Sequence, residues 1–140
     1  MLFRSLKYFT LAGDTAVRVY ANAEAAMHYA RALEIAKRLP GVGGAQFINL
    51  YAGYGHALEE SSQRETALVV YSEMETLAQA RADRAMEFAA VMHRAKIYST
   101  PNQWHNPAQA KTLLERALKL ANELGDRAAE IGRASCRERV

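Results

Sequence analysis

The side chains that could do chemistry in this sequence are few and scattered. Histidine nitrogens bind metal ions or move protons, and the four histidines are His28, His56, His93 and His105. A metal site needs several ligands at a short spacing on one face of an element, and no histidine has a partner of that kind. The adjacent Glu59 and Glu60 are expected to form a solvated helix face rather than an acid and base pair. The sequence therefore predicts neither a metal site nor a catalytic site.

The motifs of nucleotide-binding and hydrolytic enzymes are also missing from the sequence. The glycine cluster at residues 41–44 lacks the Lys-Ser/Thr that completes a phosphate-binding loop, and it is expected to be a linker. Neither Gly-x-Ser-x-Gly nor His-Glu-x-x-His occurs. We therefore expect a protein that is not an enzyme and that carries no cofactor.

The two ends of the sequence read as translated sequencing adapter. Leu2-Phe3-Arg4-Ser5 can be encoded by a DNA word whose reverse complement reads in one frame as Glu, Gln or Lys, then Ile-Gly-Arg, then the start of an Ala codon. The peptide Glu-Ile-Gly-Arg-Ala occurs at residues 130–134. The alternative is a chance coincidence of two short peptides. We expect residues 1–5 and 130–140 to be non-native, and we exclude them from the interpretation of the fold.

Without those ends the charge of the chain is nearly balanced. The full sequence has 18 Lys+Arg, 15 Asp+Glu and a pI near 9.1. Four of the basic and two of the acidic residues lie in the excluded ends, which leaves 14 and 13, and the only cysteine, Cys136, is excluded with them. The balanced charge and the lack of a basic stripe disfavour nucleic-acid binding. The lack of a long apolar run disfavours a membrane partner, so we expect a soluble, cytoplasmic protein.

An internal repeat organises residues 6–129. The aligned segments have a step of 42 residues from Ala25 to Ala67 and from Tyr29 to Tyr71, and of 43 residues from Ala67 to Ala110. Apolar residues recur at helical spacing in each segment, so each repeat is predicted to be two helices. The helices are predicted at about 6–20, 23–39, 45–61, 63–81, 84–99 and 107–124, in repeats at 6–39, 45–81 and 84–124. The alternative is an irregular helical bundle.

Residues that start and stop helices mark several of these boundaries. Ser62, with Glu65 three residues on, predicts a capping box at the start of a helix. Asn106 followed by Pro107 predicts another capped start, and Gly125 predicts a helix end. The fold class is therefore predicted to be all-α, a solenoid of three helix-turn-helix repeats.

The repeats resemble the tetratricopeptide family. In that pattern a small residue on the first helix faces an alanine and a large aromatic residue on the second helix. Gly55 fits the small position, Tyr29 and Tyr71 stand at the aromatic position, and Leu114 replaces the aromatic residue in the third repeat. The resemblance covers nearly all of residues 6–129. It implies a non-catalytic scaffold that binds a protein or peptide.

Departures from that pattern point to a narrower resemblance. The repeat is longer than the roughly 34 residues of the standard form, and His93 replaces the glycine of the first helix. The longer step, with the phrases at residues 12–14 and 123–126, is similar to helical arrays of bacterial signalling ATPases and maltose-type transcription activators. The chain is thus expected to be a regulatory scaffold from a larger bacterial protein. The alternative is the C-terminal array of such an ATPase or regulator, with its catalytic or DNA-binding modules missing.

The concave wall of a repeat array is built mostly from first helices and is where partners bind. The side chains expected to line it are Asn49, Ala52, His56, Glu59 and Glu60 from the second repeat, and Glu87, Ala90, Arg94, Ile97 and Tyr98 from the third. This wall is mixed in charge. Its partner is expected to be a protein, a peptide or another domain of the parent chain, and uncapped ends would allow self-association.

The only tryptophan, Trp104, lies in a polar insertion at residues 99–106. One interpretation makes Trp104 an anchor for a partner, because aromatic side chains dominate binding hot spots. The other places it back over the helix pair, where it caps the core. We favour the second interpretation.

The adapter interpretation gives a direct prediction. If residues 130–140 are non-native, a chain ending at Ala129 should melt at the same temperature as the full chain, measured by circular dichroism. A drop of several degrees would contradict it.

Overall fold

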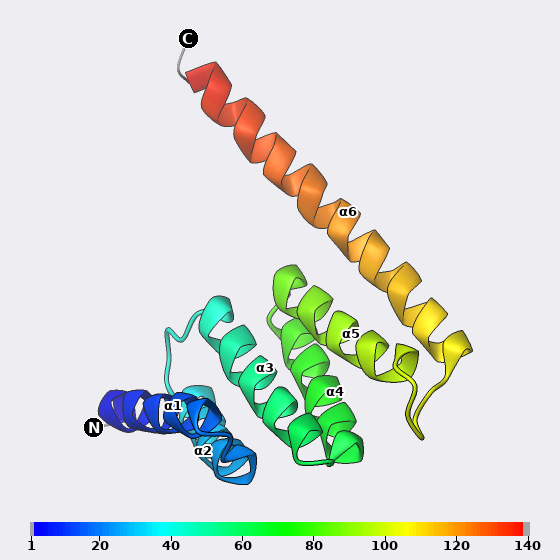
Figure 1. The fold of residues 1–140 in the computed structure, drawn as a ribbon. Coiled ribbons are helices and arrows are strands. Elements are labelled where there is room, and N and C mark those ends of the chain that lie inside the picture. The colour runs from blue at the N-terminus through cyan, green and yellow to red at the C-terminus, as the bar shows by residue number, and fades with distance from the viewer. Residues whose placement is uncertain (1, 139–140) are drawn as a thin grey trace.

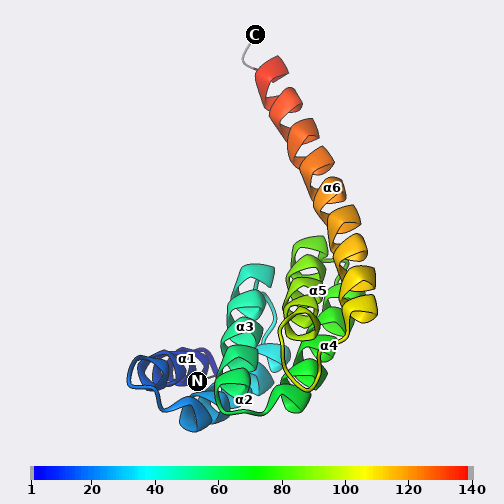
Figure 2. The ribbon, with the colours of Figure 1, turned by 45° about the vertical axis from the view of Figure 1, so that its right-hand side comes forward.

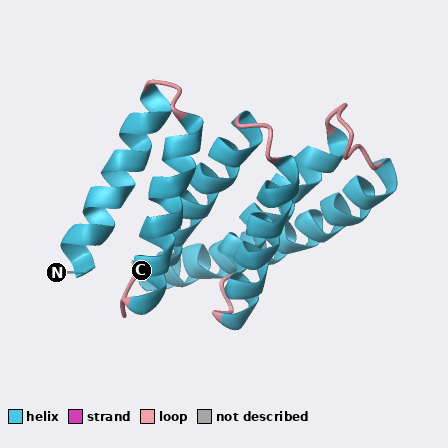
Figure 3. Ribbon diagram, turned by 90° about the horizontal axis from the view of Figure 1, so that it is seen from below, coloured by secondary structure: helices cyan, strands magenta, loops and turns pink. Residues whose placement is uncertain are grey.

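The protein is an all-α array of helices packed in chain order. A computed structural model describes the backbone of residues 2–138 and the side chains of residues 2–127. In this range there are six helices: α1 (Leu2–Arg18), α2 (Asn22–Arg38), α3 (Gly44–Glu60), α4 (Arg64–Ala80), α5 (Arg84–Ser99) and α6 (Pro107–Glu138). Each helix packs antiparallel on the next, with the turns at alternate ends of the array (Figure 3). The predicted fold class is confirmed.

The predicted helix bounds hold to within a few residues except at the two ends. The first helix begins at Leu2, and α6 continues through Gly125, where the sequence predicted an end. Gly125 does not adopt the left-handed conformation of a helix terminus. A glycine inside a helix costs about 1 kcal/mol relative to alanine, and the helix formers on both sides outweigh that cost. Figure 1 shows the long α6 extending beyond the other helices. Residues 139–140, which the adapter interpretation includes, lie outside the described part.

Three helix ends share one turn geometry. The turns after α1, α3 and α4 are each three residues long, and their middle residues, Tyr20, Ser62 and Ala82, have φ of 59°, 61° and 52°. In each turn the next amide donates back across the turn to a carbonyl five residues earlier, as in the bond of 2.8 Å from Gln63 to Leu58. This pattern is the Schellman motif.

The predicted capping box at Ser62 is therefore wrong. Ser62 terminates α3 in a left-handed conformation, and the residue that precedes α4 is Gln63, whose side chain makes no capping hydrogen bond. The cap predicted at Asn106 is confirmed, since its side-chain oxygen accepts from the Gln109 amide at 3.1 Å. Asp83 caps α5 in the same way, accepting from the Met86 amide at 3.1 Å.

Two tyrosines set the packing of the first two repeats. A Cβ placed on Gly13 would lie 2.8 Å from the Tyr29 ring, and one on Gly55 would collide with the Tyr71 ring. Tyr29 and Tyr71 are 5% and 0% exposed. A glycine on the first helix thus makes room for the aromatic ring of the second helix, at the step of 42 residues read from the sequence.

Each tyrosine also contacts the first helix of the next repeat. Gly53 on α3 leaves room for the Tyr29 ring. On α5 the His93 ring takes the corresponding place and stacks on Tyr71, with ring centroids 4.8 Å apart and planes 10° apart. The position of His93 in the repeat is therefore that of Gly53, a step of 40 residues, and not that of Gly55 as predicted.

The helix starts agree with this corrected register. The third helix begins at Gly44 and the fifth at Arg84, which is again a step of 40 residues. The small residue that corresponds to Gly55 is therefore Ala95, which is 1% exposed and packs with Leu113 and Ala117 of α6.

A buried ion-pair network replaces the tyrosine in the third repeat. Arg116 on α6 pairs with Glu75 on α4 and lies 2.5 Å from Glu87 on α5. Arg94 on α5 also lies 2.5 Å from Glu75. The two glutamates are only 7% and 3% exposed, so their charges need these partners. Arg116 thus joins three helices.

Removal of the Tyr71 ring tests this packing. We expect Tyr71→Ala to cost about 3 to 5 kcal/mol in the free energy of unfolding, because it empties a fully buried aromatic site. Tyr71→Phe keeps the ring and loses one hydrogen bond, so it should cost only about 1 kcal/mol. Urea denaturation measures both, and equal midpoints for the three proteins would show that the ring does not set the packing.

Candidate functional site: the inner wall

The first helices line one side of the array. Among the described residues, α1, α3 and α5 contact one another in succession, whereas α2, α4 and α6 do not. Helices that touch on one side and separate on the other make the array curve toward the side where they touch. Figure 2 shows this curvature along the stack. We call the exposed surface of α1, α3 and α5 on this side the inner wall.

A cleft of the inner wall lies between α1 and α3. The Tyr29 hydroxyl donates to the Asp14 carboxylate at 2.6 Å. Both side chains line a cavity of about 250 Å³, together with Thr10, Gln46, Asn49 and Leu50. Asn49 is exposed here, so its amide is open to solvent on the wall.

The contact between α3 and α5 repeats this pairing of a tyrosine with a carboxylate. The Tyr71 hydroxyl donates to the Glu59 carboxylate at 2.8 Å, and the His93 ring stacks on the Tyr71 ring. The charges of His56 and Lys96 also act on His93. His56 and Lys96 are exposed, whereas Glu59 and His93 are partly buried.

The pKa shifts follow from this burial. Burial raises the pKa of the Tyr29 and Tyr71 hydroxyls well above the usual range, and the acceptor carboxylates raise it further. Burial also lowers the pKa of the His93 imidazole. The Glu59 carboxylate opposes that change, and the charges of Lys96 and His56 add to it. At neutral pH the tyrosines are therefore hydrogen-bond donors, and His93 is uncharged.

The sequence placed several residues of the second repeat on this wall. The structure finds Asn49, His56 and Glu60 exposed on α3, with Ala52 and Glu59 partly buried beside them. Of this group, only Glu59 is hydrogen-bonded to another side chain in the described structure, the buried Tyr71 hydroxyl of α4.

The residues expected from the third repeat lie elsewhere. Glu87 is 3% exposed and belongs to the ion-pair network, as does Arg94. Tyr98 packs against the core shared with α6, and Ala90 and Ile97 are buried. The cause is the register of α5. A step of 38 residues was read where the helices have 40, and a shift of two residues turns a helix by more than half a turn.

The corrected register gives the wall of α5. A step of 40 residues carries Ala52 to Met92 and His56 to Lys96, and both α5 residues are exposed. Met92 is 39% exposed. Sequence reasoning missed Met92 and Lys96. The cap at Asp83 could have found them, because it fixes the start of α5.

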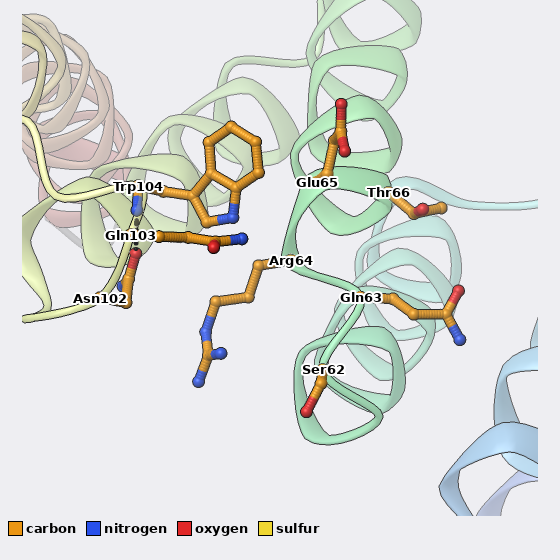
Figure 4. A pocket seen from close by; sticks show the side chains of 8 residues that line it. All are labelled: Ser62, Gln63, Arg64, Glu65, Thr66, Asn102, Gln103 and Trp104. Carbon is orange, nitrogen blue, oxygen red and sulfur yellow. Dashed lines mark hydrogen bonds between the residues drawn. The ribbon is translucent and has the colours of Figure 1, made fainter.

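Trp104 borders a separate polar cavity of about 550 Å³. The cavity lies between the loop before α6 and the first turn of α4, and Figure 4 shows the indole facing Arg64 and Glu65 across it. The indole is partly buried and packs against the main core, as the second interpretation of Trp104 expects. Asn102 holds the loop in place by accepting from the Trp104 amide at 2.7 Å.

Two further properties concern the described residues. No group of three or more His, Cys, Asp or Glu side chains in this part of the chain is arranged to hold a metal ion. None of its helices has both the length and the apolar character to cross a membrane.

Comparisons with protein families and with curated proteins give no match. No protein-family model matches the chain, and no curated protein is significantly similar to it.

The lowered pKa of His93 predicts a pH-dependent stability. The unfolded chain binds a proton at the ordinary value near 6.5, and the folded chain binds it only at lower pH. The stability that His93 contributes is therefore present above about pH 6.5 and declines as the pH falls below it. His93→Phe keeps the stacked ring without a titrating group, so its stability should fall less than that of the wild type between pH 7 and 5. His105→Gln, on the exposed loop, is the control, and urea midpoints at each pH measure the effect. Identical slopes for His93→Phe and the wild type would contradict the assignment.

Proposed function

We propose that this chain is a non-catalytic protein-interaction or regulatory scaffold whose inner wall binds a peptide segment. The proposal rests on one observation: some polar groups of the wall are already hydrogen-bonded inside the protein, and others are exposed. The buried tyrosine hydroxyls already have carboxylate acceptors, whereas the polar side chains of Asn49, His56 and Lys96 are exposed on the wall. An extended peptide has backbone groups that such side chains can bind. Because helix packing already fixes the wall, little conformational entropy is lost when a peptide binds, and this favours affinity.

The chemistry of the wall suits an amphipathic or mixed-charge peptide. Glu60 and Lys96 put both signs of charge on the wall, and Met92 adds a flexible apolar contact. No single charge dominates, so the proposal does not favour nucleic acid. The partner is a peptide of another protein or a segment of another domain of the parent chain, in a larger cytoplasmic bacterial protein.

The length of the repeat favours a second candidate of a narrower kind. Helices of 16 or 17 residues with steps of 40 to 43 residues exceed the tetratricopeptide standard of about 34 residues per repeat. The long repeats support the interpretation of this chain as the C-terminal array of a signalling ATPase or transcription regulator. A phosphate-binding module encoded upstream in the same gene would support that candidate. A gene with only further repeats would support the general scaffold.

Peptide selection tests the scaffold proposal. Peptides selected from a random displayed library on the full chain should lose at least tenfold in affinity for the double variant Asn49→Ala, Lys96→Ala. They should keep their affinity for Val69→Ala, a change on an exposed residue of α4 away from the wall. Fluorescence anisotropy with the labelled peptide gives both constants. The proposal fails if no peptide is enriched, or if the wall variant and the control bind alike.

A further inference from the structure

The two ends of the array expose apolar side chains that have buried counterparts inside it. On α6, Leu114 and Leu118 are 44% and 63% exposed, and on α1, Tyr8 and Leu11 are 64% and 55% exposed. The inference drawn from them does not rest on the proposed function, since these end surfaces are not the inner wall.

The exposed residues of α6 stand where a following helix packs in the other repeats. Leu114 occupies the position of Tyr29 and Tyr71, whose rings are covered by the first helix of the next repeat. Leu118 corresponds to Glu75, which is 7% exposed and pairs with Arg94 of that next helix. The α6 surface therefore corresponds to the surface that the next first helix covers in the other two repeats.

The exposed residues of α1 stand where a preceding helix packs in the other repeats. Stepping back 42 residues, Tyr8 corresponds to Leu50, which is 1% exposed, and Leu11 corresponds to Gly53, which contacts the Tyr29 ring of the preceding helix. Among the described residues, no helix covers the α1 surface as α2 covers α3 and α4 covers α5.

We propose that the α6 surface of one molecule packs on the α1 surface of a second copy, in the same geometry that joins α2 to α3 and α4 to α5. The internal interfaces give the pairs: Tyr71 on His93 becomes Leu114 on Leu11, and Glu75 with Arg94 becomes Leu118 with Ala12. Both new pairs are apolar, so neither buries an unpaired charge.

The shape of the α6 surface fits this contact. Leu114 and Leu118 border a largely apolar groove of about 570 Å³ that runs from the end of α5 along α6. We place Leu11 of the second copy in this groove.

A contact between two different surfaces has a definite consequence. Every copy that joins presents a free α6 surface at one end and a free α1 surface at the other, so association is open-ended and does not stop at a dimer. Mixing variants can therefore distinguish it from a symmetric dimer.

The test uses one variant for each surface. In sedimentation velocity the full chain should give a sedimentation coefficient that rises with concentration. Leu11→Glu and Leu114→Glu should each weaken association at least tenfold. An equimolar mixture of the two should form a 1:1 heterodimer and nothing larger, because each variant keeps one intact surface. Val69→Glu, on the exposed face of α4, is the control and should associate like the wild type. Circular dichroism confirms that all variants fold.

Three results would overturn the proposal. A full chain that stays monomeric at every concentration would mean that another partner covers these surfaces. A dimer that persists in either single variant would mean a symmetric contact. Association that survives in both variants would place the contact elsewhere. None of these measurements uses a peptide, so their outcome is independent of the test of the scaffold proposal.

Discussion

The array depends on a tyrosine ring held between two first helices. Tyr29 and Tyr71 each fill the space left by a glycine on the first helix of their own repeat and touch the first helix of the next repeat. One side chain thus fixes both the width of a repeat and its distance to the following one. Because the ring lies near the first helices, these helices come into contact while the second helices stay apart, and the array curves. The inner wall is a consequence of that curvature.

The hydroxyl groups of the same tyrosines determine where carboxylates lie on the wall. A buried hydroxyl needs an acceptor, and Asp14 supplies it for Tyr29 and Glu59 for Tyr71. The third repeat has Leu114 in place of the tyrosine, and there Arg116 joins buried Glu75 and Glu87. Burial alone would raise the pKa of Glu87, but hydrogen bonds from Arg116, Gln79 and Arg84 outweigh it and lower that pKa. The third repeat thus combines this charged network with an apolar cluster that includes Ala95, Leu113 and Ala117.

The sequence was sufficient for the fold class, the six helices and the pairing of glycine with tyrosine. These features depend on periodicity and on the spacing between similar residues, and neither depends on where each repeat is taken to begin. The register of α5 was not recoverable in the same way, because the sequence offers both His93 and Ala95 for the small position and the loop before α6 changes length. Ser62 was misread because a serine before a helix looks like a cap, whereas the tight turn places it in a left-handed conformation. The network around Arg116 joins residues 29 and 41 positions apart, a separation that no local pattern reveals.

The inner wall and the end surfaces use different faces of the same helices, and that separation has a structural consequence. Asn49 and Lys96 lie on the wall, whereas Leu114 lies on the end surface and does not line the cavity between α1 and α3. Stacking a second copy on α6 would bring its α1 beside α5, in the relation that α3 has to α1. The wall would then continue from Met92 and Lys96 of one molecule to Asp14 of the next. Association through the ends would lengthen the binding surface without covering it, because the contact that adds a copy is the contact that builds the wall within each molecule.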